Sequence, residues 1–286
     1  MYKITQLMGL ASLLLLGSCS SDDSRPGSDP TSKHYVLKQV NTIYYAVESD
    51  ATGNHTSSTE TRQVSYNFYY TDSNQLDSIR RDSHVFKTGV PTMPIPHGVK
   101  YQLNESLDLI SYEVKDKDYP ITNHTFTYDN GLVKNYKVSD IDLGFYEHQL
   151  EYNSNKQFVK SHSTNMTSGA EFEVNYSYNT KGELVQLTNT SNYTVNFTYD
   201  KGKNPFYSLP FDLTTLIFHD LYYIPITYAF PHNINSYKIG KEPAFTFDYT
   251  YNEDHFPIKT TIYKGAKTKS NLHMAIHYDY HIVPSI

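Results

Sequence analysis

The sequence predicts an all-β protein, a long antiparallel meander of repeated β-hairpins curled into an open barrel or a sandwich, with one short helix near residues 208–223. First, aromatic and polar residues alternate along many short segments, which is the period of two that a half-buried strand requires. Second, turn residues follow a tyrosine at intervals of 21 to 26 residues, after Tyr128, Tyr152, Tyr178 and Tyr199, as expected for a repeated hairpin. Third, the chain has 28 Tyr and 14 Phe but no Trp, and a tyrosine ring suits a strand with one wet face.

Residues 170–206 contain two clear copies of the hairpin unit. Apolar residues occupy every second position from Phe172 to Tyr178, and the positions between them are polar. Lys181-Gly182 then supplies a turn, because glycine tolerates the positive φ of a tight reversal. The alternation returns from Val195 to Tyr199 and ends in a second turn at Asp200-Lys201-Gly202. The unit is therefore aromatic-x-Tyr-(Asp or Asn), a turn, and then Leu or Phe.

Other copies of this unit occur on both sides of that stretch, at residues 64–79, 101–114, 124–133, 150–159 and 245–258. Asn130-Gly131 is the strongest short signal for a hairpin among them. Residues 51–60 are expected to form a polar loop, and three prolines between Pro91 and Pro96 exclude a central strand there. One hairpin cannot bury its own aromatic face, so neighbouring units must continue the same antiparallel sheet.

Residues 208–223 break the alternation and predict the helix. Four apolar residues recur there at helical spacing: Leu213, Leu216, Ile217 and Leu221. Pro210 lies near the start of the segment, where a missing N–H costs little. Because one helix cannot cover a sheet of this many strands, the sheet must curl over itself with its aromatic face inside.

The first 18 residues are predicted to be a lipoprotein signal peptide. Lys3 provides a short positive region, and residues 7–16 form a largely apolar run that is too short to span a membrane as a helix. The run ends in Leu16-Gly17-Ser18-Cys19, which resembles the lipobox of bacterial lipoproteins, in which the cysteine is lipidated and becomes the first residue. We therefore predict Cys19 as the lipid attachment site. The alternative is a secretory signal that is cut near an incidental cysteine.

Cys19 is the only cysteine of the chain, so the predicted mature body has no internal disulfide and no thiol for catalysis or metal binding. Residues 19–32 are rich in Ser, Asp, Pro and Gly and are predicted to form a flexible tether. Residues 33–286 are predicted to form a single β-rich domain. Two or more acyl chains give stable attachment, so the membrane is the partner predicted through the N-terminal lipid.

An acidic pair, Asp22-Asp23, follows the predicted lipidation site. It resembles the export signal that sends Bacteroidota-type lipoproteins to the outside of the outer membrane. We therefore expect an outer membrane lipoprotein exposed on the cell surface, and otherwise one that faces the periplasm. The net charge of -6 argues against nucleic acid as a partner, because nucleic acid selects for clusters of Lys and Arg.

The repeats, the stretch Tyr199–Phe206, the predicted helix and Asn233-Ile234-Asn235-Ser236 form an ordered set. This set resembles a family of tyrosine-rich lipoproteins from Bacteroidota, catalogued as a domain of unknown function, and is more loosely similar to the tyrosine–aspartate repeats of RHS-type shell proteins. The resemblance covers roughly residues 60–282, and Asp200-x-x-x-Asn204-Pro205-Phe206 followed by a helix is its specific part. It implies a β-rich fold at the envelope and no established activity, so no catalytic residues are carried over.

We assign no residue to catalysis, to a metal or to a cofactor. The best metal candidate is His277-x-Asp279-x-His281, whose side chains share one face of a strand at successive separations of about 6.5–7 Å and would suit zinc, with His273 nearby. The apolar residues between them form the other face, so we interpret the histidine face as the wet one. The sequence has no Gly-x-Ser-x-Gly elbow, phosphate loop or dinucleotide fingerprint.

We interpret the excess of tyrosine as core filler. The alternative is a ligand platform, in which exposed rings stack on sugars or form a contact patch. Five tyrosines out of phase with the repeat are candidates for such a platform: Tyr69, Tyr146, Tyr207, Tyr222 and Tyr237. Asp77-Ser78-Ile79 resembles the O-glycosylation pattern of exported Bacteroidota proteins, which makes Ser78 a candidate for modification, although the same residues are the expected return strand of a repeat.

The function predicted from these observations is that of a non-enzymatic, lipid-anchored envelope protein, a binding or scaffold module for a glycan, a peptide or an envelope protein. The alternative is a hydrolase with carboxylates or histidines in a cleft of the curled sheet. A third hypothesis, a membrane-embedded barrel, rests on the alternation alone, and the lipobox and the frequent prolines disfavour it.

Overall fold

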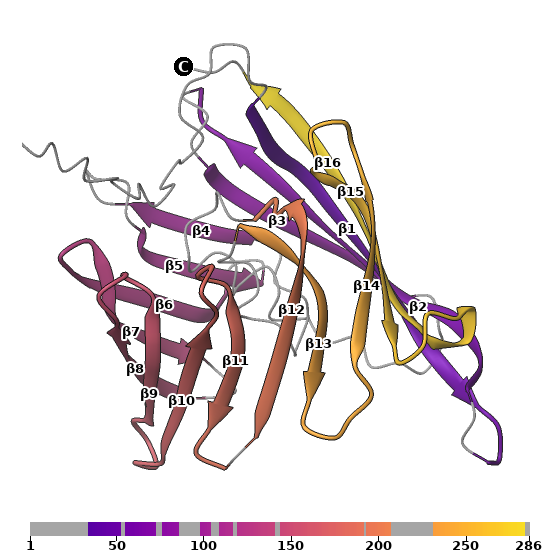
Figure 1. Cartoon of the computed structure of the whole chain (residues 1–286). Coiled ribbons are helices and arrows are strands. Elements are labelled where there is room, and N and C mark those ends of the chain that lie inside the picture. Colours follow the sequence, from indigo (N-terminus) through magenta and orange to yellow (C-terminus); the bar gives the residue numbers. More distant parts are fainter. Residues whose placement is uncertain are drawn as a thin grey trace, which may run out of the picture.

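A computed structural model describes residues 34–52, 55–72, 76–85, 98–103, 109–116, 119–140, 144–191, 193–206 and 231–283 of the chain (Figure 1). These residues form sixteen strands: β1 (His34–Ser49), β2 (His55–Tyr70), β3 (Leu76–Val85), β4 (Gly98–Leu103), β5 (Leu109–Asp116), β6 (Tyr119–Asp129), β7 (Leu132–Asp140), β8 (Gly144–Tyr152), β9 (Phe158–Asn165), β10 (Glu171–Tyr178), β11 (Leu184–Asn189), β12 (Thr194–Lys203), β13 (His232–Ile239), β14 (Phe245–Tyr251), β15 (Pro257–Lys264) and β16 (Leu272–Val283). A 3-10 turn, η2 (Lys269–Asn271), lies between the last two strands. Within these ranges, no helix is long and apolar enough to cross a membrane.

Each strand pairs antiparallel with the next one along the chain, so the strands form one meander. β1 also pairs with β16, from His34 opposite Val283 to Tyr44 opposite Met274, and this pairing joins the two ends of the meander. The prediction of an all-β antiparallel meander of hairpins curled onto itself is therefore confirmed. The single continuous sheet corresponds to the barrel form of that prediction.

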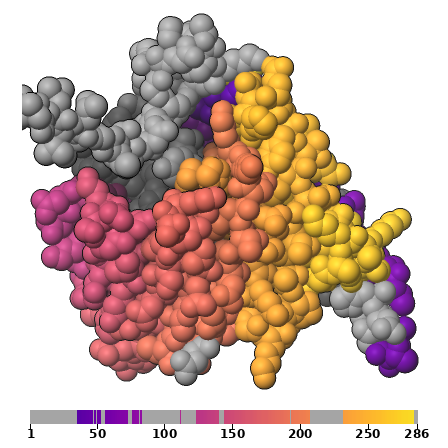
Figure 2. All heavy atoms as spheres, in the orientation of Figure 1, coloured from indigo at the N-terminus to yellow at the C-terminus, as the bar shows by residue number. Residues whose placement is uncertain are grey.

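The first hairpin is longer than the sequence predicts. β1 and β2 pair from Gln39 opposite Asn67 to Ser49 opposite His55, so the polar loop expected over residues 51–60 is wrong from residue 55 onward. Polar side chains dominate this part of β2, and such a strand carries no period of two in hydrophobicity. The tip of the hairpin projects beyond the rest of the sheet (Figure 2).

Asparagine side chains build the turn of the repeat. Oδ1 of Asn153 accepts hydrogen bonds from the backbone N–H groups of Asn155 and Gln157, at 2.9 and 3.0 Å. Asn179 and Asn252 accept the equivalent pair of bonds in their own turns. The Asn of the repeat therefore satisfies two N–H groups at the point where the chain reverses.

Tyrosine hydroxyls of the repeat connect strands to the strand before them. The hydroxyl of the repeat tyrosine donates a hydrogen bond of 2.7 Å to a backbone carbonyl of the preceding strand in two copies, Tyr152 to Val133 and Tyr178 to Phe158. Two tyrosines at other positions make the same bond, Tyr249 to Ile234 and Tyr280 to Pro257. Phenylalanine would fill the same space but would leave the carbonyl without this partner. This bond is a physical reason for tyrosine at that position of the unit.

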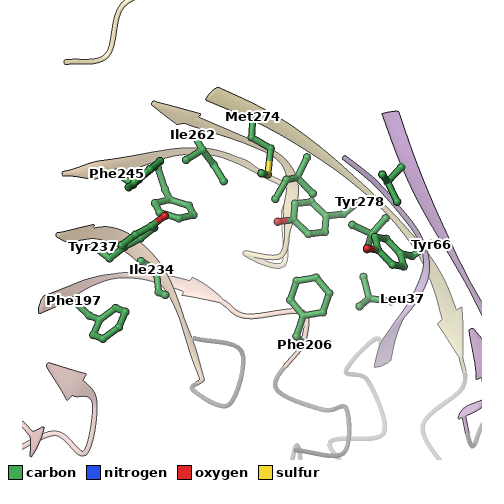
Figure 3. Packing of buried hydrophobic residues seen from close by; sticks show 14 of the residues in the cluster. Leu37, Tyr66, Phe197, Phe206, Ile234, Tyr237, Phe245, Ile262, Met274 and Tyr278 are labelled. Carbon is green, nitrogen blue, oxygen red and sulfur yellow. The ribbon is translucent and has the colours of Figure 1, made fainter. Parts of the chain in front are cut away.

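The aromatic face of the sheet points inward and forms the core (Figure 3). One cluster joins strands from both ends of the chain: Leu37, Val40, Val64, Tyr66, Phe68, Ile79, Leu184, Val195, Phe197, Phe206, Ile234, Tyr237, Ile239, Phe245, Phe247, Ile262, Met274, Ile276 and Tyr278. Phe206, which follows β12, is only 1% exposed, and its ring centroid lies 6.0 Å from that of Tyr278. The aromatic residues of these strands are buried on the inward face of the sheet. This confirms the prediction that tyrosine and phenylalanine fill the core there.

Several predicted segments lie outside the described residues. They are the signal peptide, Cys19, the tether, the proline loop at 91–96 and the helix at 208–223.

Candidate functional site

Neighbouring strands β1, β2 and β3 present polar side chains on their outward face. Val40, Tyr66 and Ile79 are buried on the inward face, so the residues on either side of them point outward. The register aligns these outward residues across the strands, with Asn41 opposite Ser65 and Gln39 opposite Asn67. We call this surface the amide face, and it consists of Gln39, Asn41, Ser65, Asn67, Tyr69, Arg80 and Asp82.

Side-chain hydrogen bonds connect residues of the amide face into one continuous network, in which each residue donates to the next. Oγ of Ser65 donates to Oδ1 of Asn41 at 2.5 Å, and Nδ2 of Asn41 donates to Oε1 of Gln39 at 2.8 Å. Nε2 of Gln39 donates to Oδ1 of Asn67 at 2.7 Å, and Nδ2 of Asn67 donates to a carboxylate oxygen of Asp82 at 3.4 Å. All these bonds run in the same direction, from a hydroxyl to a carboxylate, which fixes the orientation of each amide.

Each amide in this chain keeps hydrogen-bonding capacity beyond the bonds within the network. An amide group has two N–H donors and two carbonyl lone pairs. Asn41, Gln39 and Asn67 each donate once and accept once within the network. The amide face can therefore offer one oriented donor and one oriented acceptor per amide to a molecule in solution.

Tyr69 is the aromatic member of the amide face. It follows the buried Phe68 on β2 and is 48% exposed, so its ring lies on the same outward side as Asn67. The register places Ser78 of β3 directly opposite Tyr69. A flat, exposed ring thus lies beside the hydrogen-bonded amides.

Charges lie at the borders of the amide face rather than at its centre. Nε and Nη2 of Arg80 donate to Oδ1 of Asp82 at 3.2 and 3.1 Å. On the other border, β16 places His277 opposite Asn41 and the exposed carboxylate of Asp279 opposite Gln39. Partial burial and the nearby charge of Lys259 lower the pKa of His277, so the imidazole is neutral at pH 7. The centre of the surface is uncharged.

The predicted histidine face of β16 lies on the outward side of the sheet. His277, Asp279 and His281 are exposed, and they alternate with the buried Tyr278 and half-buried Tyr280 as the sequence predicts. No group of three or more His, Cys, Asp or Glu in the described ranges is arranged to hold a metal ion.

His273 lies apart from that outward row. Its ring meets Phe245 edge-on at 5.2 Å between centroids. Burial lowers the pKa of His273, and Lys264 adds to the effect. This histidine therefore contacts the aromatic core and stays neutral at pH 7.

The structure places three of the five off-phase tyrosines. Tyr69 is exposed on the amide face, and Tyr146 stacks beside a histidine at 6.2 Å between ring centroids. Tyr237 is 2% exposed and stacks on a phenylalanine of the core at 4.7 Å, so it is a core residue and not a platform. Tyr207 and Tyr222 lie outside the described residues.

Ser78, the candidate for O-glycosylation, lies on β3 within the predicted return strand. It is partly exposed, and its hydroxyl donates to the carboxylate of Asp77 at 2.9 Å. Its modification stays a prediction, as does lipidation of Cys19.

A second cluster lies on the inward face of β6–β10. The register places one residue from each of five successive strands directly opposite the next: Phe126, Tyr136, His148, Ser163 and Phe172. The rings of Tyr136 and His148 stack with centroids 4.1 Å apart. Nδ1 of His148 lies 2.7 Å from Oγ of Ser163. This row lies outside the main core cluster, and its last member, Phe172, is 44% exposed.

The serine–histidine pair has part of the chemistry of a nucleophile. Burial lowers the pKa of His148 to about 4, so the imidazole is neutral at pH 7 but is a weak base for the proton of Ser163, because a catalytic base works best with a pKa near the working pH. Serine catalysis also uses a group that orients the histidine and donors that stabilise an oxyanion. Among the residues that the structure describes, no carboxylate is hydrogen-bonded to His148.

The stretch from Asp200 to Phe206, the specific part of the predicted resemblance, has a structural role. The hydroxyl of Tyr251 donates to the carboxylate of Asp200, and burial together with this bond raises the pKa of Tyr251. A Cβ atom at Gly202 would collide with the same tyrosine ring, which requires glycine there. Oδ1 of Asn204 accepts a 3.0 Å hydrogen bond from the N–H of Phe206. This motif therefore positions Phe206 in the core.

Sequence reasoning missed the two clusters because it treated polar positions as solvated. Gln39 and Asn41 flank Val40, and Ser65 and Asn67 flank Tyr66. Uncharged amides at outward positions, where Lys and Glu are common, were an available signal. Their meeting depends on the pairing register of β1 and β2, which the sequence does not display.

Comparisons with solved structures show which folds this chain resembles. The chain is similar to a porin-like protein from Bacteroides uniformis, with a TM-score of 0.54 and 12% identity, over 86% of this chain and 98% of that chain. A porin-like protein from Bacteroides vulgatus matches with a TM-score of 0.36 and 11% identity, over 86% of this chain and 99% of that chain. The Photorhabdus luminescens Tc holotoxin pore matches with a TM-score of 0.31 and 14% identity, over 78% of this chain and 13% of that chain.

The first of these similarities shows a shared fold. An all-β fold like that of the Bacteroides uniformis protein agrees with the β-rich family predicted from the sequence at the level of the fold. No protein-family model matches the chain, and no curated protein sequence matches it.

Proposed function

We propose that this protein is a tyrosine-rich, lipid-anchored protein of the outer membrane, exposed at the cell surface, and that it works as a binding module rather than as an enzyme. The amide face is the observation that carries the proposal. It points outward, its amides are oriented by hydrogen bonds, and it includes the exposed ring of Tyr69. Many of the other specific polar bonds hold the fold, as the repeat tyrosines and the turn asparagines do.

The path of the chain is consistent with anchoring through Cys19. The chain enters the sheet at His34, beside the end of β16. Asn41 lies seven residues further along β1, which places it about 23 Å from His34 in an extended strand. The outward strand faces near this entry carry polar side chains, whereas a strand that spans a membrane faces lipid with apolar ones. A lipid on a tether therefore suits this body better than insertion of its strands.

Surface proteolysis of intact cells, with wild type and a Cys19→Ala variant, tests the anchor and its orientation. We expect protease to cleave the wild-type protein, and we expect the variant to leave the membrane fraction. Protection of the wild-type protein in intact cells, with cleavage after lysis, would place it on the periplasmic side. A Cys19→Ala variant that stays with the membrane would contradict the lipid anchor.

The binding role needs a separate measurement. The purified mature protein is immobilised and exposed to oligosaccharides, to peptides and to an envelope extract, and the retained molecules are identified by mass spectrometry. We expect one class of molecule to be retained, and we expect an excess of the same molecule in solution to release it. Retention of nothing from all three sources would contradict a binding module.

A hydrolase is the second candidate, and the His148–Ser163 pair is the observation that favours it. An activated serine reacts with a fluorophosphonate probe, because a neutral histidine accepts its proton. Labelling of the wild-type protein that disappears in Ser163→Ala would establish a nucleophile and overturn the non-enzymatic proposal. We expect no labelling of either form.

A further inference from the structure

We propose that the amide face binds a neutral glycan, with Tyr69 as the ring on which a sugar stacks. This inference rests on the proposed binding function and names its site and its ligand class. It is carried by the arrangement of uncharged, oriented amides beside an exposed aromatic ring on β1 and β2.

The hydrogen-bonding chemistry of the amide face matches a ligand with hydroxyl groups. A hydroxyl both donates and accepts, and an amide does the same. Asn41, Gln39 and Asn67 are held by hydrogen bonds of 2.5 to 2.8 Å on β1 and β2, so little side-chain freedom is lost when a ligand binds. Adjacent strands are about 4.8 Å apart, so these groups can contact successive hydroxyls of one molecule.

The exposed ring explains why the ligand is a sugar rather than another polar molecule. Tyr69 is 48% exposed and points outward beside Asn67. The apolar C–H face of a pyranose packs on an aromatic ring while its hydroxyls remain free to reach the amides. A flat aromatic platform next to donor–acceptor groups thus meets both faces of a sugar.

The charge of the surface favours a neutral sugar. Arg80 and Asp82 neutralise each other at 3.1 Å. On the other border His277 is held neutral by its lowered pKa, and the exposed carboxylate of Asp279 lies opposite Gln39. An acidic glycan would need cations at the centre, and a basic ligand would need carboxylates there. The three central amides carry no charge, so a charged ligand gains no ionic contact at the centre, and the Asp279 carboxylate on the border would repel an acidic ligand.

The closed pairing of the strands disfavours an extended peptide as the ligand. Peptides often bind by adding a strand to a free sheet edge. In the described part of the sheet, β1 pairs with both β2 and β16, and β2 pairs with both β1 and β3. The amide face therefore presents side chains and no strand edge.

Titration with neutral oligosaccharides tests the site. The mature protein is screened on an array of linear hexasaccharides of glucose, mannose, galactose and N-acetylglucosamine, with heparin and polygalacturonate as charged probes. The best neutral probe is then titrated by calorimetry into wild type, Tyr69→Ala, Tyr69→Phe and Tyr193→Ala. Tyr193 is the matched control, because it is 45% exposed and lies in the turn between β11 and β12.

We expect Tyr69→Ala to weaken binding about tenfold, and Tyr69→Phe and Tyr193→Ala to stay within about twofold of wild type. Thermal unfolding of each variant confirms that the fold is kept. Equal weakening by Tyr69→Ala and Tyr193→Ala would overturn the assignment of the site. Preference for heparin or polygalacturonate would overturn the neutral ligand. Binding of a peptide or an envelope protein without any glycan would refute this inference and leave the binding function standing, whereas retention of no ligand at all would refute both.

Discussion

Phe206→Ala is expected to lower the free energy of unfolding by about 3–5 kcal/mol. Phe206 is 1% exposed inside the curled sheet, where it packs in the cluster that joins both ends of the chain. Its ring points towards Leu37 and Tyr278 (Figure 3). Truncation would remove the buried ring and leave a cavity. The strands around this cavity are held by pairing with their neighbouring strands, so they can move in to fill it only in part. Urea unfolding followed by circular dichroism measures the change.

Phe145→Ala is the matched control for that experiment. Phe145 is 57% exposed at the start of β8, so we expect its truncation to change the free energy of unfolding by less than about 0.5 kcal/mol. If both variants unfold at the same urea concentration, Phe206 does not hold the core together. The motif from Asp200 to Phe206 would then need a role other than the structural one.

The fold could be predicted because the sequence repeats the signals for the same hairpin many times. The alternation identifies the strand, and Asn or Asp at the turn marks where it ends. In the structure, Asn153 and Asn179 accept backbone N–H groups at those ends, and Tyr178 bonds to the preceding strand. Such local signals are sufficient for a meander, because each strand pairs with its sequence neighbour.

Features that depend on distant pairing were harder to predict. The pairing of β1 with β16 joins residues at the two ends of the chain, and no local pattern marks it. The β1–β2 hairpin continues to His55 through polar residues, so hydrophobic alternation did not detect it. The amide face exists only because this register aligns Gln39 with Asn67, since a slip of one residue would turn one strand's amides inward.

Acid is expected to destabilise the protein through His148. Burial lowers the pKa of His148 in the folded protein to about 4, from an ordinary value of 6.5. Between these values the unfolded chain binds a proton at this imidazole and the folded protein does not, so stability falls as the pH falls. Because one pKa unit corresponds to about 1.4 kcal/mol, the loss from this group alone reaches ~3 kcal/mol near pH 4. Above pH 6.5 both states are neutral and the contribution is constant.

The difference between wild type and His148→Gln isolates this effect. Other groups act in the same direction: Glu173, whose pKa is lowered by its hydrogen bond from Lys160, and His273 and His277, whose pKa values are lowered by burial. The pH dependence of the free energy of unfolding of the wild-type protein therefore does not by itself reveal the contribution of His148. We expect urea unfolding between pH 7 and pH 4 to show a flatter dependence for His148→Gln, whereas His281→Gln, at an exposed position of β16, keeps the slope of the wild type. Parallel curves for wild type and His148→Gln would mean that this imidazole takes up its proton at the same pH in the folded protein as in the unfolded chain, so that burial does not lower its pKa.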